Sequence, residues 1–213
     1  MKGNKIKRNA IKIAMLGDSK VGKTAICQTF MNIEFNENNL STIGMEKLET
    51  QMKLKNGEEI KLIIWDTAGQ ERFHSIAINV LKSTQGVAVV FDFSNRESFE
   101  NVVKWLSEIK DNLNNNVSIV LFGNKCDKNK EEWTVTLEEA QKFAKDRKLP
   151  FFKTSAKENI GIKEGFENVV NTAYEKFEGS KGIEIKKDVG KNKKSKCCGG
   201  GDSNKEKSKK NKK

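Results

Sequence analysis

The chain has 213 residues, of which 32% are charged and 36% hydrophobic, and its net charge is +11. This length suits one domain with a substantial core, and no run approaches the roughly 20 apolar residues that span a bilayer. The charge lies at the ends, because residues 1–8 carry four Lys or Arg and no acid, and residues 179–213 carry thirteen Lys against four acids. The segment between them is nearly neutral, which argues against a nucleic-acid partner.

Neither a secretory signal nor a disulfide framework is predicted. The basic residues 1–8 are not followed by an apolar block of about 7–15 residues. The four cysteines, Cys27, Cys126, Cys197 and Cys198, do not have metal-ligand spacing, and the chain has one histidine. We therefore expect a reducing, cytoplasmic location.

Strand-like and helix-like runs alternate along the chain, which is typical of an α/β protein with a largely parallel sheet. The dipeptide Asn56-Gly57 between two alternating runs predicts a β-hairpin, so one antiparallel pair joins this sheet. The predicted strands are 10–16, 46–55, 58–65, 87–93, 117–122 and 150–153.

Capping signals and apolar stripes predict the helices. One helix over 23–31 follows the first strand, and capping-box patterns at Ser94 and Thr136 precede two amphipathic runs. A last apolar stripe ends at Phe177, after which the composition changes to Lys, Gly, Asn and Ser and order is expected to fade. The chain is thus divided into a basic extension (1–8), one folded domain (9–178) and a disordered polybasic tail (179–213).

The first chemical motif is a phosphate-binding loop between the first strand and the first helix. Glycines let its backbone N–H groups turn toward phosphate oxygens, and the helix N-terminus favours an anion. Lys23 is expected to reach the β- and γ-phosphates, and the Thr24 hydroxyl to ligate Mg²⁺. A chance match in a Gly-rich turn is the alternative, and the loop alone does not separate ATP from GTP. The residues predicted to bind nucleotide are Gly17, Asp18, Ser19, Lys20, Val21, Gly22, Lys23, Thr24 and Ala25.

The segment Asn124-Lys-Cys-Asp127 favours guanine over adenine. The Asp127 carboxylate can accept hydrogen bonds from the N1–H and the exocyclic amine of guanine. Adenine offers no such pair and would leave the carboxylate desolvated, at a cost of about 1–3 kcal/mol. This motif counts against an ATPase or a nucleotide kinase, although on its own it also fits a polar turn.

A third motif, Trp65-Asp-Thr-Ala-Gly-Gln-Glu71, follows the second strand of the hairpin. Asp66 can hold Mg²⁺ through water, and the Gly69 N–H can meet a γ-phosphate. Gln70 can orient an attacking water, the role that equivalent glutamines have in Ras and Gα proteins.

With these motifs in this order, residues 9–178 resemble the Ras superfamily and most closely its Rab family. The resemblance implies a P-loop GTPase domain with a six-stranded, mostly parallel sheet, one antiparallel strand and five flanking helices. It places Phe35 against guanine, Thr42 at Mg²⁺ and the γ-phosphate, and Lys125 along the base and ribose. It also implies a second guanine loop at Ser155, Ala156 and Lys157. The implied catalytic residues are Gln70, Lys23 and Thr42, and the implied Mg²⁺ ligands are Thr24, Thr42 and Asp66.

The implied function is a monomeric switch that binds GTP or GDP with Mg²⁺ and hydrolyses GTP slowly. Its expected partners are an exchange factor, an activating protein that accelerates hydrolysis by about 10³–10⁵, and effectors that contact residues 36–47 and 66–82. The Rab resemblance implies vesicle traffic on the cytosolic face of endomembranes. Two alternatives stay open: a GTP-loaded binding module whose hydrolysis is negligible because of Lys20, and a soluble switch outside traffic.

Four positions depart from the Rab pattern. Lys20 replaces a small residue of the phosphate loop, and Lys47 stands where an aromatic residue is usual. Val80-Leu81 stand where a tyrosine pair is usual, so Trp65 keeps only part of the aromatic surface that Rab effectors contact. The identity of the effectors is therefore not carried over.

The tail carries Cys197-Cys198, which fifteen residues follow, whereas Rab proteins carry prenylated cysteines close to the C-terminus. We expect prenylation after trimming, or palmitoylation beside the lysines, with unmodified cysteines as the alternative. The lysines of the tail are expected to attract an anionic membrane at about 1 kcal/mol each. A solubilising tail is the competing interpretation.

Overall fold

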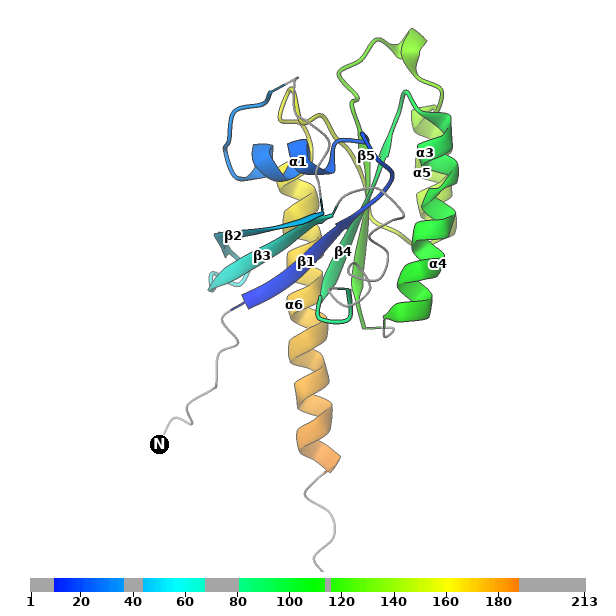
Figure 1. Ribbon diagram of the computed structural model, residues 1–213. Helices are drawn as coiled ribbons and strands as arrows, with labels where there is room; N and C mark the ends of the chain where they lie inside the picture. Colours follow the sequence, from blue (N-terminus) through cyan, green and yellow to red (C-terminus); the bar gives the residue numbers. More distant parts are fainter. Residues whose placement is uncertain (1–9, 37–43, 68–80, 114–115, 188–213) are drawn as a thin grey trace, which may run out of the picture.

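The computed structural model describes residues 10–36, 44–67, 81–113 and 116–187 (Figure 1). Its centre is one six-stranded sheet in the order β2-β3-β1-β4-β5-β6. β2 and β3 are antiparallel, and every other neighbouring pair is parallel. The strands are β1 (Ala10–Leu16), β2 (Met45–Lys53), β3 (Glu59–Thr67), β4 (Gly86–Asp92), β5 (Ser118–Asn124) and β6 (Phe151–Lys153). The predicted α/β fold with one antiparallel pair is confirmed.

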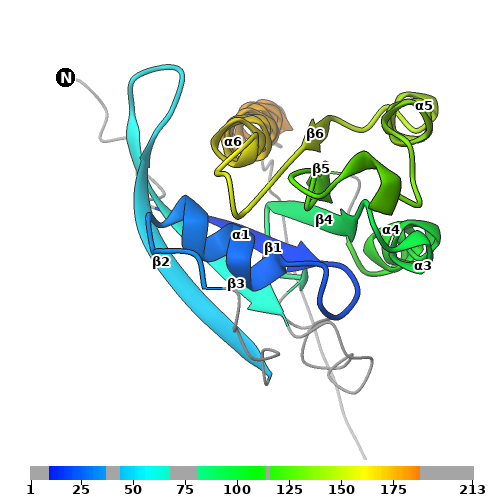
Figure 2. The same ribbon diagram turned by 90° about the horizontal axis from the view of Figure 1, so that it is seen from above.

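Helices cover both faces of the sheet, as the view along its edge shows (Figure 2). β1 explains how one strand serves both layers, because successive side chains of a strand point to opposite faces. Ile11, Ile13 and Met15 pack toward α1 and α6, whereas Ala14 and Leu16 pack toward α3, α4 and α5. The helices are α1 (Lys23–Phe30), α3 (Arg96–Glu100), α4 (Val102–Asn112), α5 (Leu137–Asp146) and α6 (Ile162–Lys187), and a short 3₁₀ helix, η2, covers Lys130–Glu132.

The parallel strands end at one edge of the sheet, where ligands of open α/β sheets usually bind. β1 leads there into Gly17, β3 brings Asp66, and β5 ends at Asn124. Thr154 follows β6, and its N–H donates to the Gly123 carbonyl at 2.7 Å. The topology therefore brings Gly17, Asp66 and Asn124, one residue from each of the three chemical motifs, to this carboxyl edge.

The β2–β3 hairpin forms at Asn56-Gly57 as predicted. Gly57, with φ of +83°, donates its N–H to the Leu54 carbonyl at 2.9 Å, and the Leu54 N–H donates to the Glu58 carbonyl at 2.8 Å. The tip of the hairpin also contacts α6. The Lys55 N–H donates to Asn171 Oδ1 at 2.9 Å, and the Tyr174 hydroxyl donates to the Glu58 carboxylate.

One of the two predicted helix caps is wrong by one residue. Asn95, not Ser94, caps α3, because Asn95 Oδ1 accepts the Ser98 N–H at 3.2 Å. Ser94 instead donates its N–H and its hydroxyl to Asp92 Oδ1, both at 2.8 Å. The amphipathic run that follows is divided into α3 and α4 at Asn101. The Thr136 cap is confirmed, since its hydroxyl oxygen accepts the Glu139 N–H at 3.1 Å.

The last helix is longer than predicted. α6 continues past Glu178 to Lys187, so order does not fade at the change of composition. No proline interrupts this segment, since the single proline of the chain is Pro150, and Lys, Glu and Ile tolerate helix well. The division of the chain into residues 1–8, 9–178 and 179–213 otherwise stays a prediction. Within the described residues, no helix combines the length and the apolar character that crossing a membrane requires.

Candidate functional site

Two glycines give the phosphate loop its shape. Gly17 has φ of +140°, and a Cβ atom there would lie 2.2 Å from the Val90 carbonyl oxygen of β4. Gly22 has φ of +98°, and its Cβ would lie 2.3 Å from Asn124 Nδ2. Larger residues would therefore push the loop away from β4 and β5. The glycines keep the backbone close to the sheet, where its N–H groups can converge on an anion.

Lys23 lies inside this loop and is buried. Its Nζ atom donates to the Gly17 carbonyl at 2.8 Å and to the Asp18 carbonyl at 2.7 Å. Burial lowers the pKa of Lys23 to about 8, although attraction to Asp66 and Asp18 acts in the opposite direction. A bound phosphate group would raise this pKa again, because a nearby negative charge favours the charged form of the amine.

The predicted Mg²⁺ ligands Thr24 and Asp66 are neighbours in space. Thr24 Oγ1 donates to Asp66 Oδ2 at 2.6 Å, and Asp66 is fully buried at the end of β3. The Thr67 hydroxyl fixes this strand end by donating to the Met15 carbonyl at 2.7 Å. The described residues contain no group of three or more His, Cys, Asp and Glu side chains placed to hold a metal. A hydroxyl and one carboxylate fit Mg²⁺, which usually takes its remaining ligands from water and phosphate.

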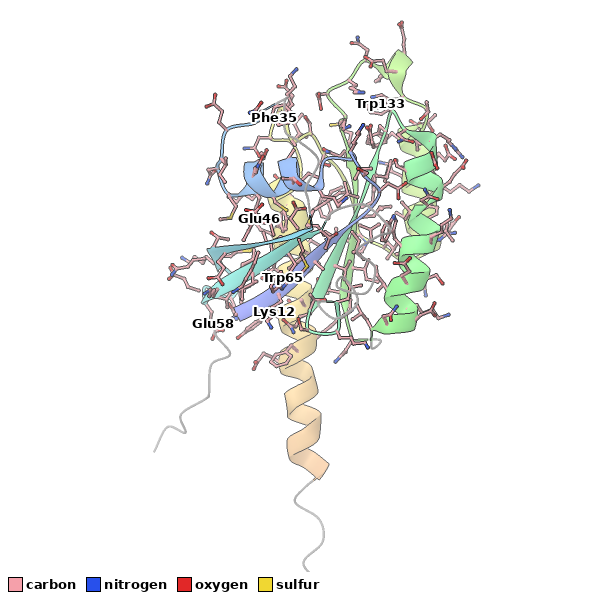
Figure 3. All side chains as sticks on the ribbon, in the orientation of Figure 1. Lys12, Phe35, Glu46, Glu58, Trp65 and Trp133 are labelled. Carbon is pink, nitrogen blue, oxygen red and sulfur yellow. The ribbon has the colours of Figure 1, made fainter. Side chains whose placement is uncertain are left out.

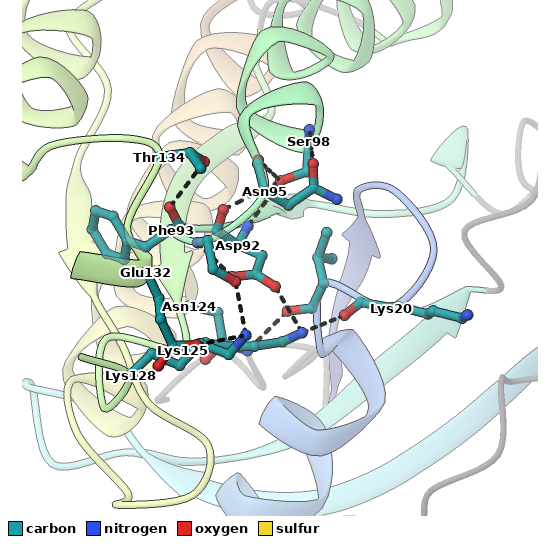
Figure 4. A network of polar contacts seen from close by, with 12 residues as sticks. Lys20, Asp92, Phe93, Asn95, Ser98, Asn124, Lys125, Lys128, Glu132 and Thr134 are labelled. Carbon is teal, nitrogen blue, oxygen red and sulfur yellow. Dashed lines mark hydrogen bonds and ion pairs between the residues drawn. The ribbon is translucent and has the colours of Figure 1, made fainter. Parts of the chain in front are cut away.

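Asn124 and Lys125 join the guanine motif to the phosphate loop (Figure 4). Asn124 Nδ2 donates to the Val21 carbonyl at 2.9 Å in the buried part of the site. Lys125 Nζ donates to the Lys20 carbonyl at 2.8 Å and pairs with Asp92 Oδ2 at 2.7 Å. These contacts hold two motifs more than 100 positions apart in one unit.

The carboxylate of Asp127 is oriented by the loop after β6. Ser155 Oγ donates to Asp127 Oδ1 at 2.6 Å, and the Cys126 N–H donates to the Thr154 carbonyl at 3.1 Å. Thr29 of α1 supports the same loop by donating its hydroxyl to the Ala156 carbonyl at 2.9 Å. The structure thus brings both predicted guanine loops together. Lys157 lies in the second of them with its side chain exposed.

The side chains of two residues of the phosphate loop, Asp18 and Lys20, are directed away from the loop. The Asp18 carboxylate is directed to α4, where Asn101 Nδ2 donates to Oδ2 at 2.7 Å and Trp105 Nε1 donates to Oδ1 at 2.8 Å. Lys20 has φ of +64°, a conformation that favours glycine. Its side chain is exposed and points away from the contact between Asp92 and Lys125 (Figure 4).

Phe35 and Trp65 have different environments (Figure 3). Phe35, after α1, is partly buried and packs on the core beside α1 and α6, so its stacking on guanine stays a prediction. Lys47 Nζ lies 6.0 Å from the centre of the Trp65 ring and also pairs with Glu49. Leu81 is buried in the core beside α4 and α5. An exposed cation, Lys47, thus stands where Rab proteins usually have an aromatic residue. Leu81 is part of the hydrophobic core.

Several predicted site residues lie outside the described residues. They are Thr42, Gly69, Gln70, Cys197 and Cys198, and their roles stay predictions. Sequence reasoning missed three side chains that shape the site: Asn101, Trp105 and Asp92. Only Asp92 carried a signal, since a buried carboxylate at a strand end needs a partner.

The chain is similar to proteins of the Ras family over most of its length. Residues 12–175 match the model of the Ras family. The chain is 37% identical over 191 residues to "Ras-related protein Rab-10" of Diplobatis ommata, which covers 88% of this chain and 94% of that protein. It is 39% identical to "Ras-related protein Rab-10" of Caenorhabditis elegans over 78% of this chain and 82% of that protein. It is also 37% identical to "Ras-related protein Rab-13" of Rattus norvegicus, over 74% and 77% of the two chains.

Proposed function

This chain belongs to the Ras family and is a Rab small GTPase, and from this we propose which of its residues bind and hydrolyse GTP. It is a GTP-binding switch of vesicle traffic, which binds GTP or GDP with Mg²⁺ and hydrolyses GTP. Exchange factors, GTPase-activating proteins and effectors regulate such switches. The relatives do not favour a module without hydrolysis or a switch outside traffic.

The phosphate side of the site consists of the loop Gly17–Thr24 and Asp66. Backbone N–H groups of Asp18, Ser19 and Val21 surround the phosphates, and Lys23 places its ammonium beside the β- and γ-phosphates. Thr24 and Asp66 would hold Mg²⁺ with their hydroxyl and carboxylate oxygens. When bound, the ion neutralises negative charge on the phosphate oxygens. The support is the contact between the Thr24 hydroxyl and the Asp66 carboxylate at 2.6 Å.

The base side consists of Asn124, Lys125 and Asp127 with the loop Ser155–Lys157. Asp127 accepts hydrogen bonds from guanine while Ser155 fixes the carboxylate. The Ala156 N–H faces the base oxygen, and Lys125 and Phe35 flank the base. The observation that carries this proposal is the direct bonding of Asn124 and Lys125 to the phosphate loop. These hydrogen bonds hold the base side next to the phosphate side, as the binding of one nucleotide by both sides requires.

Hydrolysis needs groups that act on the γ-phosphate and on water. Gln70 orients the attacking water, and Thr42 and Gly69 contact the γ-phosphate, as the motif positions imply. Effectors then contact residues 36–47 and 66–82, which include the exposed Lys47 beside Trp65. This surface favours effectors that present an acidic or hydrogen-bonding group to Lys47 in place of an apolar one.

We propose that the tail attaches the protein to membranes and that the protein is a monomer. Lipid on Cys197 or Cys198, together with the lysines of residues 179–213, would supply the two signals that stable anchoring needs. The protein would then move between the cytoplasm and the cytosolic face of endomembranes. The relatives support this at the level of the family.

Single-turnover hydrolysis and competition binding test the proposed residues. Wild-type protein should bind GTP in preference to ATP and release phosphate slowly. Lys23→Ala should abolish tight binding, whereas Gln70→Leu should retain binding and lose most hydrolysis. Nanomolar GTP affinity in Lys23→Ala would remove Lys23 from the site, and an unchanged rate in Gln70→Leu would remove Gln70 from the mechanism.

A further inference from the structure

The carboxylate of Asp18 has both oxygens engaged by one helix. Asn101 precedes α4 directly and donates Nδ2–H to Oδ2 at 2.7 Å, while Trp105, one turn later, donates Nε1–H to Oδ1 at 2.8 Å. Side chains one turn apart share a helix face, so this face presents two donors to a single anion. Hydrogen bonds to an ionised acceptor are roughly twice as strong as those between neutral groups.

Asp18 is held on its backbone side as well. Its carbonyl accepts Lys23 Nζ at 2.7 Å, and the next residue of the loop is Ser19. Asn101 and Trp105 are both partly buried, and Trp105 packs against the apolar cluster between the sheet and α3, α4 and α5. The start of α4 is thus anchored in the core and is a firm support for the loop.

We propose that Asp18 is a positioning residue, which joins the phosphate loop to α4 through Asn101 and Trp105 and thereby slows the release of guanine nucleotide. The inference rests on the proposed function, because it assumes that this loop surrounds the phosphates. With its carboxylate oxygens turned to α4, Asp18 contacts nucleotide only through its backbone. Its side chain acts by holding those backbone groups in the geometry that phosphate requires.

Nucleotide release from the full chain tests the proposal. The protein is loaded with a fluorescent GDP analogue in the presence of Mg²⁺, and its loss is followed after addition of excess GDP. Asp18→Ala should release the analogue about tenfold faster than wild type, which is the scale of a mutation that changes coupling between neighbouring elements. Trp105→Phe and Asn101→Ala should each accelerate release by a smaller factor.

The matched control is Asn112→Ala. Asn112 lies at the end of the same helix, and its Nδ2 donates to the Glu108 carbonyl of that helix at 2.9 Å, away from the loop. Release from Asn112→Ala should equal that from wild type. Adding Asn101→Ala to Asp18→Ala should change release little, because the contact is already lost. If Asp18 only stabilised the fold, the variants would have lower thermal stability. Their release rates would then not show faster release in Asp18→Ala and Asn101→Ala with little further change in the double variant.

Each outcome decides a different point. Failure of the wild-type chain to bind the analogue would overturn the proposed function itself. Normal binding with release from Asp18→Ala within twofold of wild type would overturn only the positioning role. Independent, multiplying effects of Asp18→Ala and Asn101→Ala would also overturn it. If Asp18→Ala does not fold, release from the Asn101→Ala/Trp105→Phe double variant decides, with a wild-type rate again contradicting the proposal.

Discussion

At the residue scale, the proposed phosphate ligand Lys23 is expected to link nucleotide binding to pH. Burial lowers its pKa from 10.5 to about 8 in the unliganded site, and phosphate would raise that pKa again because it favours the charged form. Below about pH 8 the ammonium is already present when nucleotide arrives. Above it, binding takes up a proton, so affinity falls as the pH rises.

We therefore expect the dissociation constant for GDP to rise about fourfold between pH 7 and pH 8.5, as a group with a pKa of about 8 requires. Fluorescence titration measures the change, and calorimetry in two buffers of different ionisation enthalpy measures the proton uptake. This range lies below the titration of the guanine base. A constant affinity without proton uptake would show that Lys23 is fully charged in the unliganded protein.

The proposed role of Asp127 in the preference for guanine is tested at the same scale. Asp127→Asn replaces an acceptor with a donor opposite the guanine N1–H, so GTP affinity should fall by about 1–3 kcal/mol or more and xanthine nucleotide should gain. Competition binding with GTP and xanthosine triphosphate measures the shift. Ser155→Ala removes only the hydrogen bond that orients the carboxylate and should weaken GTP binding less, without changing the base preferred. An unaltered preference in Asp127→Asn would contradict the guanine assignment.

At the element scale, α6 packs closely on β5 at Gly165. A Cβ atom on Gly165 would lie 1.9 Å from Cε1 of the buried Phe122 ring. Gly165→Ala should therefore destabilise the protein by about 1–3 kcal/mol through overpacking, although alanine favours helix by about 1 kcal/mol over glycine. Urea unfolding measures the difference. Lys163→Ala, on the exposed face of the same helix, should stay within about 0.5 kcal/mol of wild type; equal stability of Gly165→Ala would mean that α6 can shift away from β5.

The elements differ in how far sequence reasoning could predict them. The strands were predictable because buried parallel strands form continuous apolar runs, and the hairpin because Asn56-Gly57 suits a tight turn. The cap of α3 was not, since Ser94 and Asn95 are both good caps and only the bonds of Ser94 to Asp92 decide between them. The end of α6 was not, because composition does not fix where a helix ends.

In the candidate site, too, some features could be predicted from the sequence and others could not. The grouping of Lys23, Thr24 and Asp66 follows from motifs at strand ends, which the parallel sheet brings to one edge. The direction of the Asp18 side chain does not follow, because its partners Asn101 and Trp105 lie 83 and 87 positions away. No local pattern marks a polar residue of an amphipathic helix as the partner of a particular carboxylate.

At the scale of the whole molecule, the net positive charge is concentrated in the two terminal segments of the chain. The net positive charge of residues 1–8 and 179–213 together exceeds the net charge of +11 of the whole chain, so the segment between them is slightly negative. The protein should therefore bind vesicles containing phosphatidylserine, and removal of residues 188–213 should abolish most of this binding, at about 1 kcal/mol per lysine near the surface. Sedimentation with vesicles measures it, and high salt should reverse it. Equal binding to uncharged vesicles would point to lipid on the cysteines instead, which the intact mass of protein from its own cells would reveal.

The contacts at the hairpin tip limit how the strands can move. β2 and β3 pair without interruption from Met45 and Thr67 to Lys53 and Glu59, and Asn171 and Tyr174 fasten the turn between them to α6. Sliding the hairpin along β1 would break the parallel pairing of β1 with β3, which runs from Ala10 and Lys61 to Ala14 and Trp65, and both of these bonds at once. A change of register is therefore too costly to serve as the response to GTP. Any response to GTP is therefore expected at the carboxyl edge of the sheet, at the end of the molecule opposite the hairpin tip.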